Sequence, residues 1–281
     1  MAGDRTRVGN VEILACNDGM LELPVQMVFP TLAAGAMTPF NQRYPQTVSP
    51  QGNILDPMGF YVLRSQGKTV LVDTGIGPGP IEAFGGVRGN LPQELRRQGV
   101  KAEEIDVVLL THLHPDHVGW NLTAQGRPTF PRARYLVHRA DWEFFTNRDN
   151  WKLLPYPYVE SCVLPLQRLG VLDLVTGERA VTGEVTTLPT PGHTPGHMSV
   201  LIASAGQRAI VTGDVSVHAA QVTETDWNTA FDGIPEMASE TRRQLLDRIE
   251  REGMIMIAGH FPVPGIGKLV RLQGKRYWQA L

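Results

Sequence analysis

The residues whose types and spacing are best suited to chemistry lie in one short segment. It reads Thr-His-Leu-His-Pro-Asp-His-Val-Gly over residues 111–119. It offers imidazoles and a carboxylate, which are good ligands for zinc and similar divalent metals. Alternate side chains of an extended segment point the same way, so His112 and His114 can share one metal ion. Asp116 and His117 come after the chain turns, and they face a second point nearby. The spacing therefore predicts a metal site.

Three further potential ligands are spread along the rest of the chain. His193, Asp214 and His260 each follow an apolar run and a small residue. A sheet places side chains at one of its edges in this way, because loops that follow strands carry the site while the strands hold it rigid. We expect His193 to supply a third imidazole to the first metal, and the carboxylate of Asp214 to bridge two cations.

Short apolar strands and well-bounded helices are expected to position these ligands. A buried strand, Ile105 to Leu110, leads directly into the histidine segment, and the helix from Pro235 to Glu252 has Pro at its start and Gly253 after its end. Met254 to Ala258 is the last clear strand. The other expected elements are hairpins over 60–63 with 69–72 and 199–203 with 208–212, a strand over 135–137, and helices over 91–98 and 140–146. Two batches of strands, each closed by helices, predict an α/β sandwich, and the absence of a linker predicts one domain over residues 1–281.

Three stretches fit this pattern less well. Residues 23–42 carry no charge but contain three prolines, so we interpret them as a strand followed by an apolar loop and not as a membrane span. Residues 37–57 and 150–165 are rich in proline and carry aromatic side chains. Such long loops either line a site or partner surface, or are pinned to the surface by their own aromatics.

Composition excludes several classes of function. Lys and Arg number 26 against 28 Asp and Glu, a net charge of −2, which removes the usual electrostatic case for binding nucleic acid or an anionic membrane. Cys16 and Cys162 form neither a disulfide framework nor a Cys-based zinc motif. The first ten residues lack the apolar core of a signal peptide. We therefore expect a protein of a reducing compartment, the cytoplasm.

The ordered set of ligands resembles the metallo-β-lactamase superfamily over almost the whole chain. The resemblance implies an αββα sandwich of two mixed sheets, with helices on the outer faces and two divalent metal ions at the sheet edge, zinc first, with iron, manganese or cobalt as alternatives. Asp73, in a segment similar to an early strand and turn of the family, would support the site from behind the ligands. The implied ligands are His112, His114 and His193 for the first metal, Asp116, His117 and His260 for the second, and Asp214 as the bridge.

Within the superfamily, residues 213–221 and 259–267 are most similar to the branch of methyl parathion hydrolase and the acyl-homoserine lactonases. That branch implies attack of a metal-bridging hydroxide on a small ester, which would be a lactone, an organophosphate or an aryl ester. Asp116 would accept the proton and Asp214 would hold both metals. The lactonases carry a Tyr three residues after the bridging Asp, where this chain has Val217.

The aromatic and remaining histidine residues supply the candidates for substrate contacts. These are Trp120, His218 and Phe29, with core packing as the alternative for Phe29 and an ordinary hydrogen-bonded role as the alternative for His218. His138 and His197 are interpreted as ordinary hydrogen-bonded residues. The expected partner is a small ester or lactone, and a homodimer is left open. Three other functions are left open as well: a thioester hydrolase similar to glyoxalase II, a diiron oxidoreductase that works with a flavin partner, and a metal-binding protein without catalysis.

Overall fold

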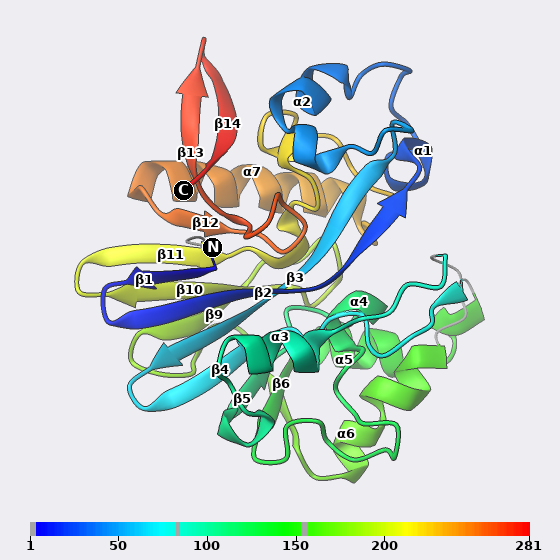
Figure 1. Cartoon of the computed structure of the whole chain (residues 1–281), viewed down its shortest axis with the longest axis vertical. Coiled ribbons are helices and arrows are strands. Elements are labelled where there is room, and N and C mark those ends of the chain that lie inside the picture. The colour runs from blue at the N-terminus through cyan, green and yellow to red at the C-terminus, as the bar shows by residue number, and fades with distance from the viewer. Residues whose placement is uncertain (1–3, 83–84, 153–156) are drawn as a thin grey trace.

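The computed structural model of the chain describes residues 4–82, 85–152 and 157–281. Two seven-stranded sheets lie face to face between two groups of helices (Figure 1). Apolar side chains from both sheets meet in the layer between them, among them Val70, Leu109, Val200 and Ile257. This is the burial expected for strands that are covered on both faces.

The first sheet follows chain order. Its strands are β1 (Arg5–Val8), β2 (Val11–Leu23), β3 (Ile54–Ser65), β4 (Lys68–Val72), β5 (Val107–Leu109), β6 (Arg134–His138) and β7 (Leu172–Val175). Strands β1 to β4 pair antiparallel, whereas β4 to β7 pair parallel. The carboxyl ends of the parallel strands therefore lie at a common edge, and β5 carries the histidine segment to it.

The second sheet runs in reverse chain order from β14 to β8. Its strands are β8 (Arg179–Ala180), β9 (Val185–Pro189), β10 (Met198–Ser204), β11 (Gln207–Val211), β12 (Ile255–Ile257), β13 (Ile266–Leu272) and β14 (Lys275–Ala280). Only β11 and β12 pair in parallel, and the other neighbours are antiparallel. Both sheets are therefore mixed, as expected.

Helices cover both outer faces (Figure 1). Helices on the side of the first sheet are α3 (Leu91–Arg97), α4 (Pro115–Val118), α5 (Arg139–Thr146) and α6 (Pro165–Arg168), while α1 (Val25–Val28), α2 (Thr38–Arg43) and α7 (Pro235–Glu252) lie on the side of the second. Single turns complete the chain: η1 (Pro45–Thr47), η3 (Ala102–Glu104), η4 (Asn150–Lys152), η5 (Val159–Val163), η6 (Gly213–Val215) and η7 (Ala219–Val222). Among the described residues, no helix is both long and apolar enough to span a bilayer.

Helix α7 shows how local sequence fixes an element. Pro235 opens it, and Gly253 ends it in the left-handed conformation at φ 61°, which glycine adopts without strain. Leu245 and Ile249 are one helical turn apart and pack against the second sheet, where they meet residues such as Met256. The predicted bounds of this helix are confirmed.

The predicted sandwich is confirmed, and so are both hairpins and the helices near residues 91–98 and 140–146. Two expectations about strands need correction. Strand β5 spans Val107–Leu109 and is shorter than Ile105 to Leu110. The strand near residues 254–258 is not the last, because β13 and β14 follow it as a hairpin. At the tip of this β13–β14 hairpin, Gln273 and Gly274 both have positive φ. Exposed charged residues in the two strands hide their apolar alternation in the sequence.

The uncharged stretch over residues 23–42 is not simply a strand and a loop. Strand β2 ends at Leu23 as expected, but α1 and α2 then form short helices. Proline at the start of a helix occupies a position whose N–H would be unpaired anyway, so Pro24 and Pro39 permit these turns. Within the stretch over 150–165, residues 153–156 lie outside the described residues, and the rest forms η4, η5 and the start of α6.

Candidate metal centre

The histidine segment lies where β5 meets α4. The strand ends at Leu109, the chain bends at Thr111, and His114 is extended directly before the first turn of α4. Asp116 and His117 lie in that turn. The extended stretch and the turn therefore separate the segment into two pairs of side chains, as its spacing predicts.

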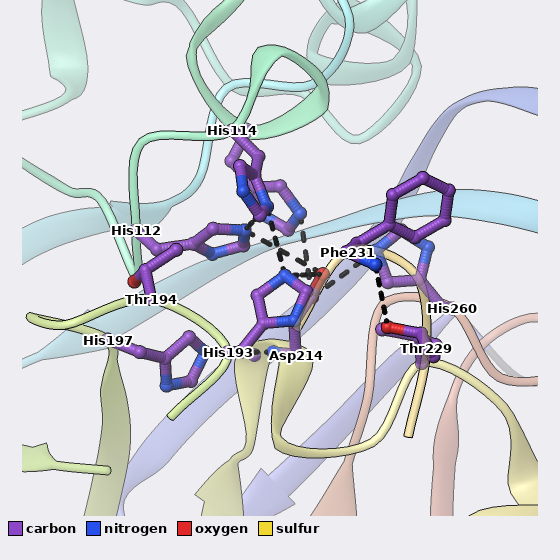
Figure 2. Close-up of polar contacts among 12 residues, drawn as sticks. His112, His114, His193, Thr194, His197, Asp214, Thr229, Phe231 and His260 are labelled. Carbon is purple, nitrogen blue, oxygen red and sulfur yellow. Dashed lines mark hydrogen bonds and ion pairs between the residues drawn. The ribbon is translucent and has the colours of Figure 1, made fainter. Parts of the chain in front are cut away.

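The other three ligands come from loops of the second sheet. His193 lies between β9 and β10, Asp214 lies in η6 directly after β11, and His260 follows β12. Figure 2 shows His112, His114, His193 and His260 gathered around Asp214. The centre therefore lies at one edge of the sandwich and takes side chains from both sheets.

The first group of ligands, called trio A here, consists of His112, His114 and His193. Nε2 of His112 lies 3.0 Å from Nδ1 of His114, and that Nδ1 lies 2.9 Å from Nε2 of His193. Three ring nitrogens of buried or half-buried residues thus converge on one point.

The second group, trio B, consists of Asp116, His117 and His260. Oδ2 of Asp116 lies 3.5 Å from Nε2 of His117 and 3.6 Å from Nε2 of His260. Of the three, Asp116 is the most exposed, at 20% of its side chain. Trio B is therefore more open to solvent on its carboxylate side.

Asp214 stands between the two trios and turns one oxygen to each. Its Oδ2 lies 3.7 Å from Nε2 of His112 and 3.3 Å from Nε2 of His193. Its Oδ1 lies 3.5 Å from Nε2 of His117 and 3.3 Å from Nε2 of His260. A single carboxylate in this position can serve two cations at once.

These donors fit a pair of divalent cations. Nε2 of His117 and Oδ1 of Asp214 are buried and have no hydrogen-bond partner among the described residues, which is costly for groups that remain without an ion. Ligand atoms about 2.1 Å from a tetrahedral metal lie roughly 3.3 Å from one another, similar to the spacings around Asp214. Neutral imidazoles and carboxylates are also the donors that zinc prefers.

The ring nitrogens that face away from the trios are held by other groups. Nδ1 of His117 lies 2.9 Å from Oδ2 of Asp73, which also accepts the hydroxyl of Thr111 at 2.8 Å. Nδ1 of His193 lies 2.8 Å from Oδ1 of Asp232. Nδ1 of His260 lies 3.0 Å from the carbonyl oxygen of Pro57. Such partners fix the orientation of a ligand ring and raise its basicity, so the supporting role expected of Asp73 agrees with its contacts.

The histidines and carboxylates of the centre shift the pKa values of one another. Burial disfavours the charged form of His117, but Asp214, Asp116 and Asp73 outweigh it and hold the pKa of His117 well above its usual value. Burial and His117 together lower the pKa of His112. Burial raises the pKa of Asp116, but His117 and His260 outweigh it and leave that pKa low, so the carboxylate is ionised at neutral pH. Divalent cations that bind here would displace the protons of these side chains.

His197 supports the bridging residue and belongs to neither trio. Its Nε2 accepts the backbone N–H of Asp214 at 2.9 Å, and its Nδ1 lies 2.8 Å from the hydroxyl of Thr190. Burial lowers the pKa of His197 to about 3, in keeping with a neutral ring. Gly213 has φ 53°, and a Cβ there would stand 2.6 Å from Nε2 of His197, so only glycine allows this contact. The hydrogen-bonded role expected of His197 agrees with these contacts.

The residues expected to contact substrate belong to neither trio. Trp120 follows α4, and its indole N–H lies 3.1 Å from a carboxylate oxygen of the buried Asp18. Phe29 is fully buried, and its ring meets that of His218 edge-on at 6.3 Å between centroids. Nε2 of His218 is buried without a hydrogen-bond partner in the described part of the chain. Contact of these three residues with a substrate stays a prediction.

Sequence reasoning missed two carboxylates that hold ligand rings. Asp232 contacts His193, and Asp56 lies 2.9 Å from Nδ1 of His260. Both are distant in sequence from the histidine that they contact, and neither belongs to a ligand motif.

Proteins of known sequence and structure resemble this chain over most of its length. An N-acyl homoserine lactonase of Bacillus cereus is 27% identical over 231 residues, which cover 76% of this chain and 85% of the relative. The structure of a hydrolase named AbOPH superposes with a TM-score of 0.86 at 23% identity and covers 100% of this chain and 98% of its own. AidC, described as a dizinc quorum-quenching lactonase in complex with a product, superposes with a TM-score of 0.83 at 20% identity over 99% of this chain and 96% of its own.

The family model of the metallo-beta-lactamase superfamily matches residues 60–260, a span that runs from within β3 to the last ligand. It contains the histidine segment, both trios and Asp214. The predicted resemblance is thereby confirmed, and the chain belongs to the metallo-beta-lactamase superfamily.

Proposed function

We propose that this protein is a metal-dependent hydrolase that opens lactones, with zinc as the metal in both positions. One observation carries the proposal: Asp214 turns one oxygen to each of two ligand trios. A structural zinc site is closed by four ligands around one ion, whereas two adjoining sets that share a carboxylate are typical of hydrolytic centres.

Two divalent cations bound there would activate water as a nucleophile and polarise the carbonyl of the substrate. The chain itself supplies the proton acceptor. Asp116 is ionised and is the most exposed member of trio B, so its carboxylate can take a proton from the attacking water and release it to the leaving oxygen. No serine or cysteine nucleophile is required. Cys16 is buried, and burial raises its pKa to about 12, so it is not a thiolate at neutral pH.

The choice of a lactone rests on the relatives. Proteins named N-acyl homoserine lactonase match three quarters of this chain at 26–27% identity. Val217 stands where we expect a lactonase to carry tyrosine, and it is buried beside Phe29 and Met58. A different group must therefore hold the leaving oxygen of the lactone. We assign this contact to His218, which lies four residues after Asp214 and whose Nε2 is buried without a hydrogen-bond partner among the described residues. Trp120 stays a candidate for contact through its ring, because Asp18 holds its indole N–H.

A panel of substrates tests the proposal. Purified protein loaded with zinc is offered an acyl-homoserine lactone, an aliphatic lactone, an aryl ester, paraoxon and a thioester, and its metal content is measured in the same preparation. We expect two zinc ions per chain and a kcat/KM for the acyl-homoserine lactone at least tenfold above those for the other substrates.

The other outcomes identify the alternatives. Preference for the thioester would indicate a glyoxalase II-like enzyme, and preference for paraoxon or the aryl ester would indicate the other ester classes. Stable iron with oxygen or nitric oxide reduction would indicate an oxidoreductase. A protein with bound metal and no turnover of any substrate would contradict the proposal altogether.

A further inference from the structure

Helix α7 buries a charged residue that the proposed chemistry does not use. Arg242 lies in the middle of the helix with only 1% of its surface exposed, near the apolar residues Ala238, Leu245 and Leu246 that cover the second sheet. Burial of a guanidinium costs several kcal/mol unless it is paired and hydrogen-bonded. An apolar residue would suit the packing better, so the presence of arginine calls for a specific reason.

The contacts of Arg242 supply that reason, because they connect separate segments of the centre. Its Nε donates to the carbonyl oxygen of Val215 at 2.7 Å, and Val215 directly follows Asp214. Its Nη1 donates to the carbonyl oxygens of Thr225 and Trp227 at 2.7 and 3.0 Å. A planar guanidinium with five N–H groups can reach such divergent acceptors, whereas lysine cannot.

The third branch of the guanidinium leads to trio A. Nη2 of Arg242 lies 3.5 Å from Oδ2 of Asp232, a side chain that is also only 1% exposed. The other oxygen of Asp232 lies 2.8 Å from Nδ1 of His193. The backbone reinforces this link, since the N–H of Gly233 donates to the carbonyl oxygen of His193 at 2.9 Å.

One side chain therefore holds both the turn that carries Asp214 and the carboxylate that orients His193. Nε2 of His193 and Oδ2 of Asp214 lie 3.3 Å apart, closer than the 3.7 Å between Nε2 of His112 and the same oxygen. A shift of either segment would change this spacing first. Trio B depends on this guanidinium less, because only its contact with Asp214 is shared, while Asp73 and Pro57 hold the rings of His117 and His260.

We propose that Arg242 is a positioning residue that sets the spacing of His193 and Asp214, and with it the affinity of trio A for a divalent cation. The inference rests on the proposed metal centre. It predicts that the two metal positions differ in their sensitivity to a change at Arg242. Partners that support a ligand from behind are typically worth 10- to 100-fold in metal affinity.

The test is titration of the metal-free protein with Co²⁺ alone, followed by absorption spectroscopy and equilibrium dialysis. For Arg242→Met we expect the dissociation constant at one position to rise about 10- to 100-fold, with an altered cobalt spectrum there, and a clearly smaller rise at the other. Arg242→Lys keeps the charge but loses the planar guanidinium with its divergent N–H groups. It should therefore keep only part of the cobalt affinity that Arg242→Met loses. Arg243→Met is the matched control, because Arg243 is exposed and contacts Asp226 and Glu240 from outside.

If Arg242→Met does not fold, Asp232→Asn provides the test instead. It removes the charge of the carboxylate that lies between Arg242 and His193. It should weaken the same position, and the double variant with Arg242→Lys should lose less than the sum of the two losses, because both act through His193. Equal weakening of both positions, strictly additive losses, or unchanged cobalt binding with reduced stability would overturn the inference. Wild-type protein that binds no cobalt would instead overturn the proposed function itself.

Discussion

At the scale of single residues, Asp214 is the carboxylate that lies between the two trios. It is buried, its Oδ1 lacks a hydrogen-bond partner within the described residues, and four imidazole nitrogens lie within 3.3–3.7 Å of its oxygens. Burial alone would raise its pKa, but His260, His117 and His112 outweigh burial and hold that pKa well below its usual value. The carboxylate is therefore present as an anion, the form that binds cations.

Asp214→Ala should accordingly abolish the bridge while leaving six ligands in place. We expect kcat to fall by at least about 100-fold and the metal content to drop below two ions per chain. Turnover assays with metal analysis of the same sample measure both. His138→Asn is the control, since the side chain of His138 accepts the backbone N–H of Ala140 at the start of α5, a role that Asn also performs. Full activity of Asp214→Ala would show that the carboxylate does not bridge.

The convergence of the seven candidate ligands could be predicted from sequence because their spacing is local or follows a strand. Asp232 and Arg242 could not, since nothing within their own segments marks them as part of a site. Their role arises only when α7 packs over the loop after η7 and brings a buried guanidinium to a carboxylate. His218 lies between these cases: the sequence places it near Asp214, and only the structure shows its buried contact with Phe29.

At the scale of elements, α7 connects the centre at one end with the β13–β14 hairpin at the other. Glu250 in its last turn accepts hydrogen bonds from Arg271 of β13 and Arg276 of β14, each at 2.8 Å. Hydrogen bonds from Arg271, together with those from Arg276, outweigh the opposing effect of burial and lower the pKa of Glu250 to about 2. The hairpin, which apolar periodicity did not reveal, is thus attached to the helix by charge.

Glu250→Gln should expose this attachment through its pH dependence. A carboxyl whose pKa falls on folding stabilises the native state above its ordinary pKa of 4.5, and this contribution is lost as the pH falls towards 2. We expect the variant to lose about 0.5–1 kcal/mol of unfolding free energy at pH 7, because the pairs are partly exposed and screened.

Urea unfolding at pH 7 and at pH 3 measures the effect, and the difference from wild type should shrink at the lower pH. Glu143→Gln, at an exposed pair whose charged atoms are 4.0 Å apart, should change stability little at either pH. A Glu250→Gln difference that grows towards pH 3 would contradict the assigned sign.

At the scale of the whole molecule, the centre joins the two sheets. The segment after β5 of the first sheet supplies four of the candidate ligands, and the loops after β9, β11 and β12 of the second sheet supply His193, Asp214 and His260. Bound cations would therefore fasten one sheet to the other across the open edge. Length, apolar content and the order of strands sufficed to predict the sandwich, but the pairing of β5 between β4 and β6 could not be derived from strands of three to five residues.

Removal of the metals should thus loosen the whole protein and not only inactivate it. A ligand present at about 100 times its dissociation constant adds about 2.7 kcal/mol to stability, which corresponds to a melting temperature roughly 5–10 °C higher. Calorimetry before and after dialysis against a chelator should show that drop, and added Zn²⁺ should reverse it. Asp214→Ala should show a smaller response. Equal melting temperatures with and without chelator would rule out metals as a link between the sheets.

The order of the ligands along the chain has a consequence for biosynthesis. Trio A is complete once His193 has been translated, whereas trio B waits for His260, which emerges only after α7 and β12. During synthesis, all the side chains of trio A are therefore made before helix α7, whereas those of trio B are complete only after it.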